Sequence, residues 1–123
     1  IQGGSQVKRI LIVDDEEHIR MLYKEELLED GYDVLTAGDG EEALKIVEKE
    51  DLDLIIMDVR MPKMGGIEAL RKVKEIKPDL PVLLNTAYTE FKMDFGSWAS
   101  EEYIIKSSNL DDLRSAVKKH LKE

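Results

Sequence analysis

The sequence predicts an α/β fold in which a parallel sheet is covered by helices on both faces. Two observations lead to this prediction. Five short aliphatic runs alternate with longer segments of helical period, which is the pattern of strands joined by helical crossovers. The runs ILIV at 10–13 and LIIM at 54–57 are continuously apolar, as central parallel strands are. We therefore expect an open, doubly wound sheet in which these two strands lie side by side.

The strands are expected where β-branched and aliphatic residues gather between polar or turn-forming positions. In chain order they are Arg9–Val13, Asp33–Ala37, Leu54–Met57, Val82–Asn85 and Tyr103–Ile105. The first and third are the apolar runs that should form the centre of the sheet, because both faces of such strands are buried.

Four amphipathic helices are expected between and after these strands, because apolar residues recur there at helical spacing. Their apolar stripes are Ile19, Leu22, Tyr23 and Leu27, then Ala43, Leu44 and Val47, then Ile67, Leu70 and Val73, and finally Leu110, Leu113, Val117 and Leu121. Asp30-Gly31 should end the first helix, Pro78 should follow the third, and Ser108 with Asp111 should start the last. The segment 88–100 fits a helix only loosely, so we expect a short or irregular one.

Composition restricts the function. The chain has 123 residues, enough for one domain, which we expect to span residues 7–123, with residues 1–6 left over from recombinant expression. The net charge of −9 opposes direct binding to nucleic acid, and the absence of cysteine excludes disulfides and thiolate chemistry. No apolar run is long enough to span a membrane, so a soluble, cytoplasmic protein without a membrane partner is expected.

Polar side chains follow four of the expected strands. Asp14 and Asp15 follow the first strand, Asp58 the third, Thr86 the fourth and Lys106 the fifth. In an open doubly wound sheet the functional crevice lies outside the carboxyl ends of the strands, so we expect these groups to converge. Three converging carboxylates would repel one another unless a cation lay among them.

A hard divalent cation such as Mg²⁺ suits this set, because it binds carboxylate oxygens and keeps positions for water and phosphate oxygens. Asp15 and Asp58 can supply the direct carboxylates. Asp58 can then attack a phosphoryl donor, while Mg²⁺, Thr86 and Lys106 neutralise the phosphoryl oxygens. The sequence therefore predicts phosphoryl transfer to an aspartate.

Several motifs together carry a resemblance to a known family. They are VDD at 13–15, MDVRMPKMGG at 57–66, TA at 86–87 and YIIK at 103–106. From about Lys8 onward, the chain resembles the receiver domain of two-component response regulators. The resemblance implies a three-layer α/β/α architecture and a five-stranded parallel sheet in the flavodoxin-like strand order 2-1-3-4-5.

The resemblance also implies a role for each site residue. Asp58 would be the phosphoacceptor, binding Mg²⁺ directly together with Asp15. Asp14 would act through water, and the Arg60 backbone carbonyl would complete the protein ligands. Thr86 and Lys106 would contact the phosphoryl group.

The resemblance further implies a switch and a set of partners. Thr86 would move toward the phosphoryl group and Tyr103 would turn inward, which would alter the face formed by the segment 88–100, the strand Tyr103–Ile105 and the last helix. A sensor histidine kinase or phosphotransfer protein would be the donor, and an effector protein or domain the target. The protein would be a monomer or a weak homodimer through that face. It would catalyse only its own phosphorylation and dephosphorylation, and so would not be an enzyme in the usual sense.

The sequence departs from the family in the last part of the chain. Family members usually have proline after the lysine, with a cis peptide bond, whereas this chain has Lys106-Ser107. A cis bond before serine would cost about 3–4 kcal/mol, so we expect a trans bond and a rearranged loop. Gly96 interrupts the segment 88–100, at a cost of roughly 1 kcal/mol relative to alanine within a helix.

Simpler interpretations stay open for individual residues. Asp14-Asp15 alone could be a solvated turn, Thr86 a helix cap, Lys106 a solubilising charge and Tyr103 a strand aromatic. Among whole-protein alternatives, a flavodoxin-like cofactor binder would need a phosphate cradle where this chain has acidic residues. A haloacid-dehalogenase-type hydrolase would need a second aspartate where Arg60 stands. The main rival is a phosphorylation-independent interaction module on the same fold.

Overall fold

The computed structural model describes residues 7–86, 102–106 and 110–121. Their elements are β1 (Arg9–Val13), α1 (Glu17–Glu29), β2 (Asp33–Ala37), α2 (Gly40–Lys49), β3 (Leu54–Asp58), α3 (Gly66–Ile76), β4 (Val82–Thr86), β5 (Glu102–Ile105) and α4 (Asp111–His120). The strands form one parallel sheet in the order β2-β1-β3-β4-β5. The predicted strand order is thus confirmed.

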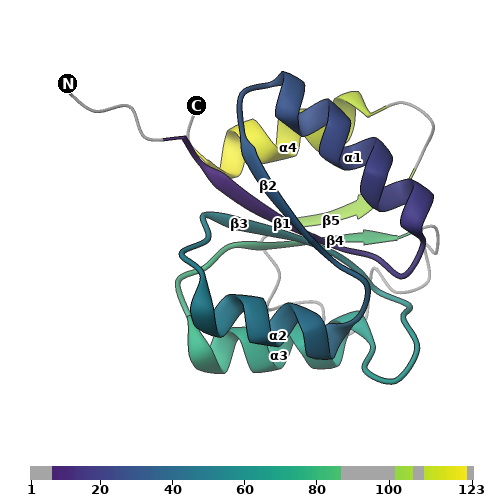
Figure 1. Cartoon of the computed structure of the whole chain (residues 1–123), viewed down its shortest axis with the longest axis vertical. Coiled ribbons are helices and arrows are strands. Elements are labelled where there is room, and N and C mark those ends of the chain that lie inside the picture. The colour runs from purple at the N-terminus through teal and green to yellow at the C-terminus, as the bar shows by residue number, and fades with distance from the viewer. Residues whose placement is uncertain (1–6, 87–101, 107–109, 122–123) are drawn as a thin grey trace.

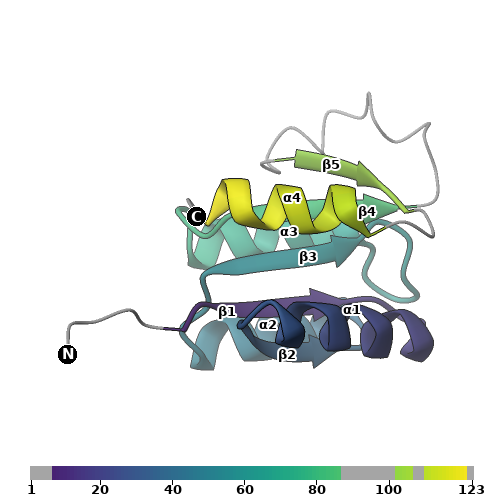
Figure 2. The same cartoon turned by 90° about the horizontal axis from the view of Figure 1, so that it is seen from above.

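Helices cover both faces of this sheet, with α1 and α4 on one side and α2 and α3 on the other (Figure 1). Figure 2 shows the sheet turned, with the five strands pointing the same way. Successive strand residues point to opposite faces, so Ile10 and Ile12 pack with α1 and α4, whereas Leu11 and Val13 pack with α2 and α3. The three-layer α/β/α architecture expected from the family is therefore present.

Three strands are longer than the sequence predicts. Asp58 and Thr86 are the last residues of β3 and β4, and β5 begins at Glu102. The reason is that the strand ladder continues, since Asp58 is the register partner of Asn85, and Thr86 is that of Ile105. The site residues predicted to follow these two strands thus lie on the strands themselves.

The predicted stripe on the first helix is too wide. Tyr23 and Leu27 are buried, but Leu22 is 42% exposed. Adjacent residues are about 100° apart around a helix, so burying Tyr23 turns Leu22 toward solvent. The helix ends as predicted, because Asp30 is its C-cap and Gly31 has a φ of 95°, a value that favours glycine.

Some predictions fall outside the described residues. These are the short or irregular helix at 88–100, the start of the last helix at Ser108, and the trans Lys106-Ser107 peptide bond. The last described helix, α4, has Leu110 at its N-cap and no side-chain cap hydrogen bond. None of the helices in the described ranges is both long and apolar enough to cross a membrane.

Side chains alternate between the two faces of a strand, and this alternation places several polar side chains on the same face at the carboxyl edge of the sheet. Ile12, Ile56, Leu83 and Ile104 belong to the apolar cluster under α1 and α4. The residues two positions further along are Asp14, Asp58, Asn85 and Lys106. Pairing continues past β1 and β5, since the Asp14 amide donates to Ala37 at 3.1 Å and the Lys106 amide donates to Thr86 at 2.6 Å. We therefore find these side chains on the α1 and α4 side of the carboxyl edge.

Candidate functional site

Three carboxylates converge at the carboxyl edge of the sheet. Asp14, Asp15 and Asp58 each offer an oxygen atom, and these atoms lie within 4.8 Å of one another. Asp14 and Asp58 are buried, whereas Asp15 is exposed. An all-oxygen donor set with one face open to solvent fits a hard divalent cation such as Mg²⁺.

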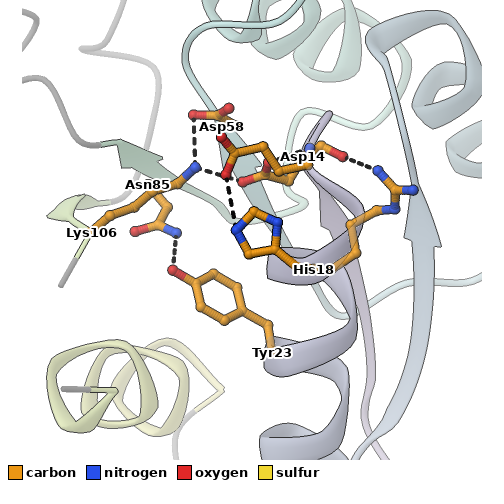
Figure 3. A network of polar contacts seen from close by, with 8 residues as sticks. Asp14, His18, Tyr23, Asp58, Asn85 and Lys106 are labelled. Carbon is orange, nitrogen blue, oxygen red and sulfur yellow. Dashed lines mark hydrogen bonds and ion pairs between the residues drawn. The ribbon is translucent and has the colours of Figure 1, made fainter. Parts of the chain in front are cut away.

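Lys106 lies against two of these carboxylates. Its Nζ is 2.7 Å from Asp14 Oδ2 and 3.5 Å from Asp58 Oδ1 (Figure 3). Burial lowers the pKa of Lys106, but the hydrogen bond to Asp14 and the charges of Asp58 and Asp14 outweigh burial and raise the pKa overall. The ammonium group therefore remains charged beside the acidic cluster.

The surroundings of Asp58 alter its protonation. Burial is the largest cause, and the negative charge of Asp14 adds to it, while Lys106 acts in the opposite direction. Together they raise the pKa of Asp58 from 3.8 to about 6. Without a bound cation, the folded protein thus disfavours the ionised carboxylate.

This pKa shift predicts a pH-dependent stability. Because the folded pKa is raised, the stabilising contribution of Asp58 is present below pH 3.8, declines as the pH rises, and is gone above about 6. In EDTA, the parent should lose about 3 kcal/mol relative to Asp58→Asn across that range. Urea unfolding of both proteins at a series of pH values measures this difference. Identical pH dependence in the two proteins would contradict it.

The loop that carries Asp14 and Asp15 is fixed by the start of α1. Asp14 Oδ1 accepts a hydrogen bond from the Glu16 amide at 2.9 Å. Arg20 Nη1 donates to the Asp14 backbone carbonyl at 2.6 Å. The first turns of α1 therefore determine where the acidic pair lies relative to Asp58.

The start of α3 packs directly against the backbone of Asp58. The Gly66 amide donates to the Val59 carbonyl at 2.8 Å. A Cβ atom at Gly66 would collide with the Asp58 carbonyl oxygen, so a side chain here would displace the acceptor strand or the helix. Glycine is required at this position by the close approach of the two backbones.

The other predicted site residues are Thr86, Arg60 and Tyr103, which come from the segments around the carboxyl edge of the sheet. Thr86 is fully buried at the end of β4, and Arg60 lies two positions after Asp58 in the loop before α3. Tyr103 is in β5, but its side chain is outside the described part of the chain. The structure thus brings Asp14, Asp15, Asp58 and Lys106 together; it places Thr86 at the same edge.

Sequence reasoning missed two polar residues beside the site. Asn85 Nδ2 donates to Tyr23 Oη at 2.8 Å, and both residues are buried (Figure 3). Tyr23 was predicted only as part of the apolar stripe of a helix. The available signal was Asn85 itself, a polar residue inside the otherwise aliphatic stretch VLLNT, immediately before Thr86.

Three converging carboxylates and a lysine at the carboxyl edge of a parallel sheet suit a site that accepts a phosphoryl group. The family model of the response regulator receiver domain matches residues 10–118 of the sequence. The chain therefore belongs to that family.

Relatives and solved structures agree with this assignment. The chain is 39% identical over 116 residues to sporulation initiation phosphotransferase F of Bacillus subtilis, covering 93% of this chain and 94% of that protein. It is 42% identical over 113 residues to the transcriptional regulatory protein PhoP of the same organism, covering 90% of this chain but only 47% of PhoP.

The response regulator TrrA of Thermotoga maritima has been solved with Mg²⁺ and BeF, and it superposes with a TM-score of 0.91 at 47% identity, covering 93% of this chain and 99% of TrrA. TrrA has also been solved in complex with the histidine kinase ThkA, and there it superposes with a TM-score of 0.88 at 48% identity, covering 94% of this chain and 99% of TrrA.

Proposed function

We propose that residues 7–123 act as one receiver domain in which Asp58 accepts the phosphoryl group. The observation that carries this proposal is the position of Lys106, whose ammonium contacts Asp14 and Asp58 within a cluster of three carboxylates. A cation beside a partly buried carboxylate can neutralise charge on an incoming phosphoryl group. A structural salt bridge alone would not require the third carboxylate, Asp15.

The acidic cluster is proposed as a Mg²⁺ site. Asp15 and Asp58 would be the direct carboxylate ligands, Asp14 would act through water, and the Arg60 backbone carbonyl would complete the protein ligands. Burial and the negative charge of Asp14 raise the pKa of Asp58, and a bound cation would favour the ionised carboxylate, which supports this assignment. When bound, Mg²⁺ would offset the negative charge of the carboxylates and phosphoryl oxygens.

The proposed reaction is the transfer of a phosphoryl group between two nucleophiles. A carboxylate oxygen of Asp58 attacks phosphorus and forms an O–P bond, while the P–N bond of a phosphohistidine breaks and its electron pair returns to the imidazole nitrogen. Lys106 and the Thr86 hydroxyl face the phosphoryl oxygens as charge spreads over them. Water reverses the modification by attacking phosphorus. The chain would thus catalyse only its own phosphorylation and dephosphorylation.

The donor is proposed to be a sensor histidine kinase or a phosphotransfer protein. The solved complex of TrrA with the kinase ThkA supports this proposal. The target would be an effector protein or domain in the cytoplasm, reached without direct binding to nucleic acid. The net charge of −9 is consistent with that last point.

The output is proposed to pass through the face formed by the segment 88–100, β5 and α4. Thr86 would move toward the phosphoryl group and Tyr103 would turn inward. The same face would support a weak homodimer, and otherwise the protein would be a monomer. The Lys106-Ser107 pair would alter the loop that carries the lysine.

A phosphodonor experiment tests the proposed function. With Mg²⁺ and phosphoramidate, the intact mass should increase by one phosphoryl group, and EDTA should abolish the increase because the three carboxylates would then lack their cation. Intact mass spectrometry follows the reaction. An absence of uptake by folded, Mg²⁺-bound protein would instead favour a phosphorylation-independent interaction module.

A further inference from the structure

Helix α1 reaches the neighbourhood of the acceptor site through Tyr23. The Tyr23 hydroxyl accepts the hydrogen bond from Asn85, and the two residues are only 3% and 2% exposed. We propose that Tyr23 is a positioning residue for phosphoryl transfer, acting through Asn85. This inference rests on the proposed function of Asp58.

Asn85 connects Tyr23 to the reacting groups. It is the register partner of Asp58 on the neighbouring strand, and paired residues of parallel strands project to the same face. It also directly precedes Thr86, the proposed contact of the phosphoryl group. In Figure 3 the Tyr23 ring points from α1 to the Asn85 amide, near Lys106. An anchored Asn85 therefore fixes the end of β4 beside Asp58.

Because it is buried, this hydrogen bond holds Tyr23 and Asn85 in one relative position. A hydroxyl and an amide are costly to bury unless they are paired, so these two buried side chains cannot shift apart freely. Burial also raises the pKa of Tyr23, so the phenol stays neutral at physiological pH. An apolar pair of similar size would fill the space without fixing a relative position.

Arg20 makes a second contact from α1 to the carboxyl edge of the sheet. Arg20 lies three residues before Tyr23, and residues at this spacing are neighbours on a helix. Arg20 holds the Asp14 carbonyl at the end of β1, while Tyr23 holds Asn85 at the end of β4. The sheet order places β3, with Asp58 at its end, between those strands. Helix α1 thus fixes both neighbours of the acceptor strand.

The test compares rates of phosphoryl uptake from saturating phosphoramidate. Tyr23→Phe removes only the hydroxyl, and the rate constant should fall about threefold to tenfold, the equivalent of one net hydrogen bond. The Mg²⁺ concentration at half-maximal rate should stay unchanged. Tyr32→Phe is the matched control. Tyr32 is a buried tyrosine of the apolar cluster that also contains Tyr23, but it directly precedes β2 and so lies at the amino ends of the strands, away from Asp58.

A double variant separates positioning from mere stability. Tyr23→Phe with Asn85→Leu removes both polar groups, so the melting temperature should recover relative to Tyr23→Phe alone. The rate should remain low, because the side-chain hydrogen bond from β4 to α1 is still missing. Recovery of both the rate and the melting temperature in the double variant would overturn the proposal. So would an unchanged rate in Tyr23→Phe, or an effect of Tyr23→Phe on the Mg²⁺ requirement alone.

The parent protein separates this inference from the proposed function. A parent that is not phosphorylated would overturn the proposed function as well. A parent that is phosphorylated, with Tyr23→Phe unaffected, would overturn only this inference.

Discussion

Asp58→Asn should abolish phosphoryl uptake while leaving the fold intact. The amide has nearly the shape of the carboxylate, but it is not a nucleophile for phosphorus, so the rate should fall by at least about a thousandfold. The buried position of Asp58 beside Lys106 tolerates a neutral group, because the pKa of the acid is already raised to about 6. Intact mass and circular dichroism measure uptake and folding on the same samples.

Asp51→Asn provides the matched control. Asp51 is an exposed aspartate that precedes β3, at the end of the strand opposite Asp58, so the same chemical change there should not affect uptake. Phosphoryl uptake by Asp58→Asn at the parental rate would place the acceptor elsewhere. Peptide mapping would then distinguish Asp14 from Asp15, the other two carboxylates of the cluster.

Much of the fold follows from local patterns in the sequence. The continuous runs ILIV and LIIM reveal the two central strands because only strands covered on both faces are apolar throughout. The acidic cluster was predictable for a related reason, since parallel strands bring their carboxyl ends to one edge. Asp14, Asp15 and Asp58 needed no further information to be grouped, and the convergence of their oxygens within 4.8 Å agrees with that grouping.

The contacts that depend on side-chain packing could not be predicted. The Tyr23 hydroxyl and the Asn85 amide are 62 residues apart in sequence, and only the packing of α1 on the sheet brings them together. The exposure of Leu22 likewise depends on the rotation of α1 about its axis, which helical spacing alone leaves undetermined. The collision that a side chain at Gly66 would cause requires knowing how closely α3 approaches Asp58.

Lys106→Met should slow phosphoryl uptake without changing the acceptor. Methionine retains much of the length and apolar volume of the stem but removes the ammonium, which lies 2.7 Å from Asp14 and 3.5 Å from Asp58. Loss of a preorganised charge of this kind costs roughly a hundredfold to a thousandfold in rate. Uptake should remain detectable in long incubations, and it should still map to Asp58. Time courses of intact mass with saturating Mg²⁺ and phosphoramidate measure the effect.

Lys119→Met distinguishes this role from a general loss of positive charge. The Lys119 side chain is 71% exposed and its Nζ is 3.5 Å from Glu102, so its removal should leave the rate unchanged. A parental rate in Lys106→Met would show that the Lys106 ammonium only balances the buried carboxylates. In that case the variant should still be less stable than the parent in EDTA at neutral pH, because Asp14 and Asp58 would share no cation. Measuring rate and stability on one variant therefore separates neutralisation of the phosphoryl oxygens from neutralisation of the site itself.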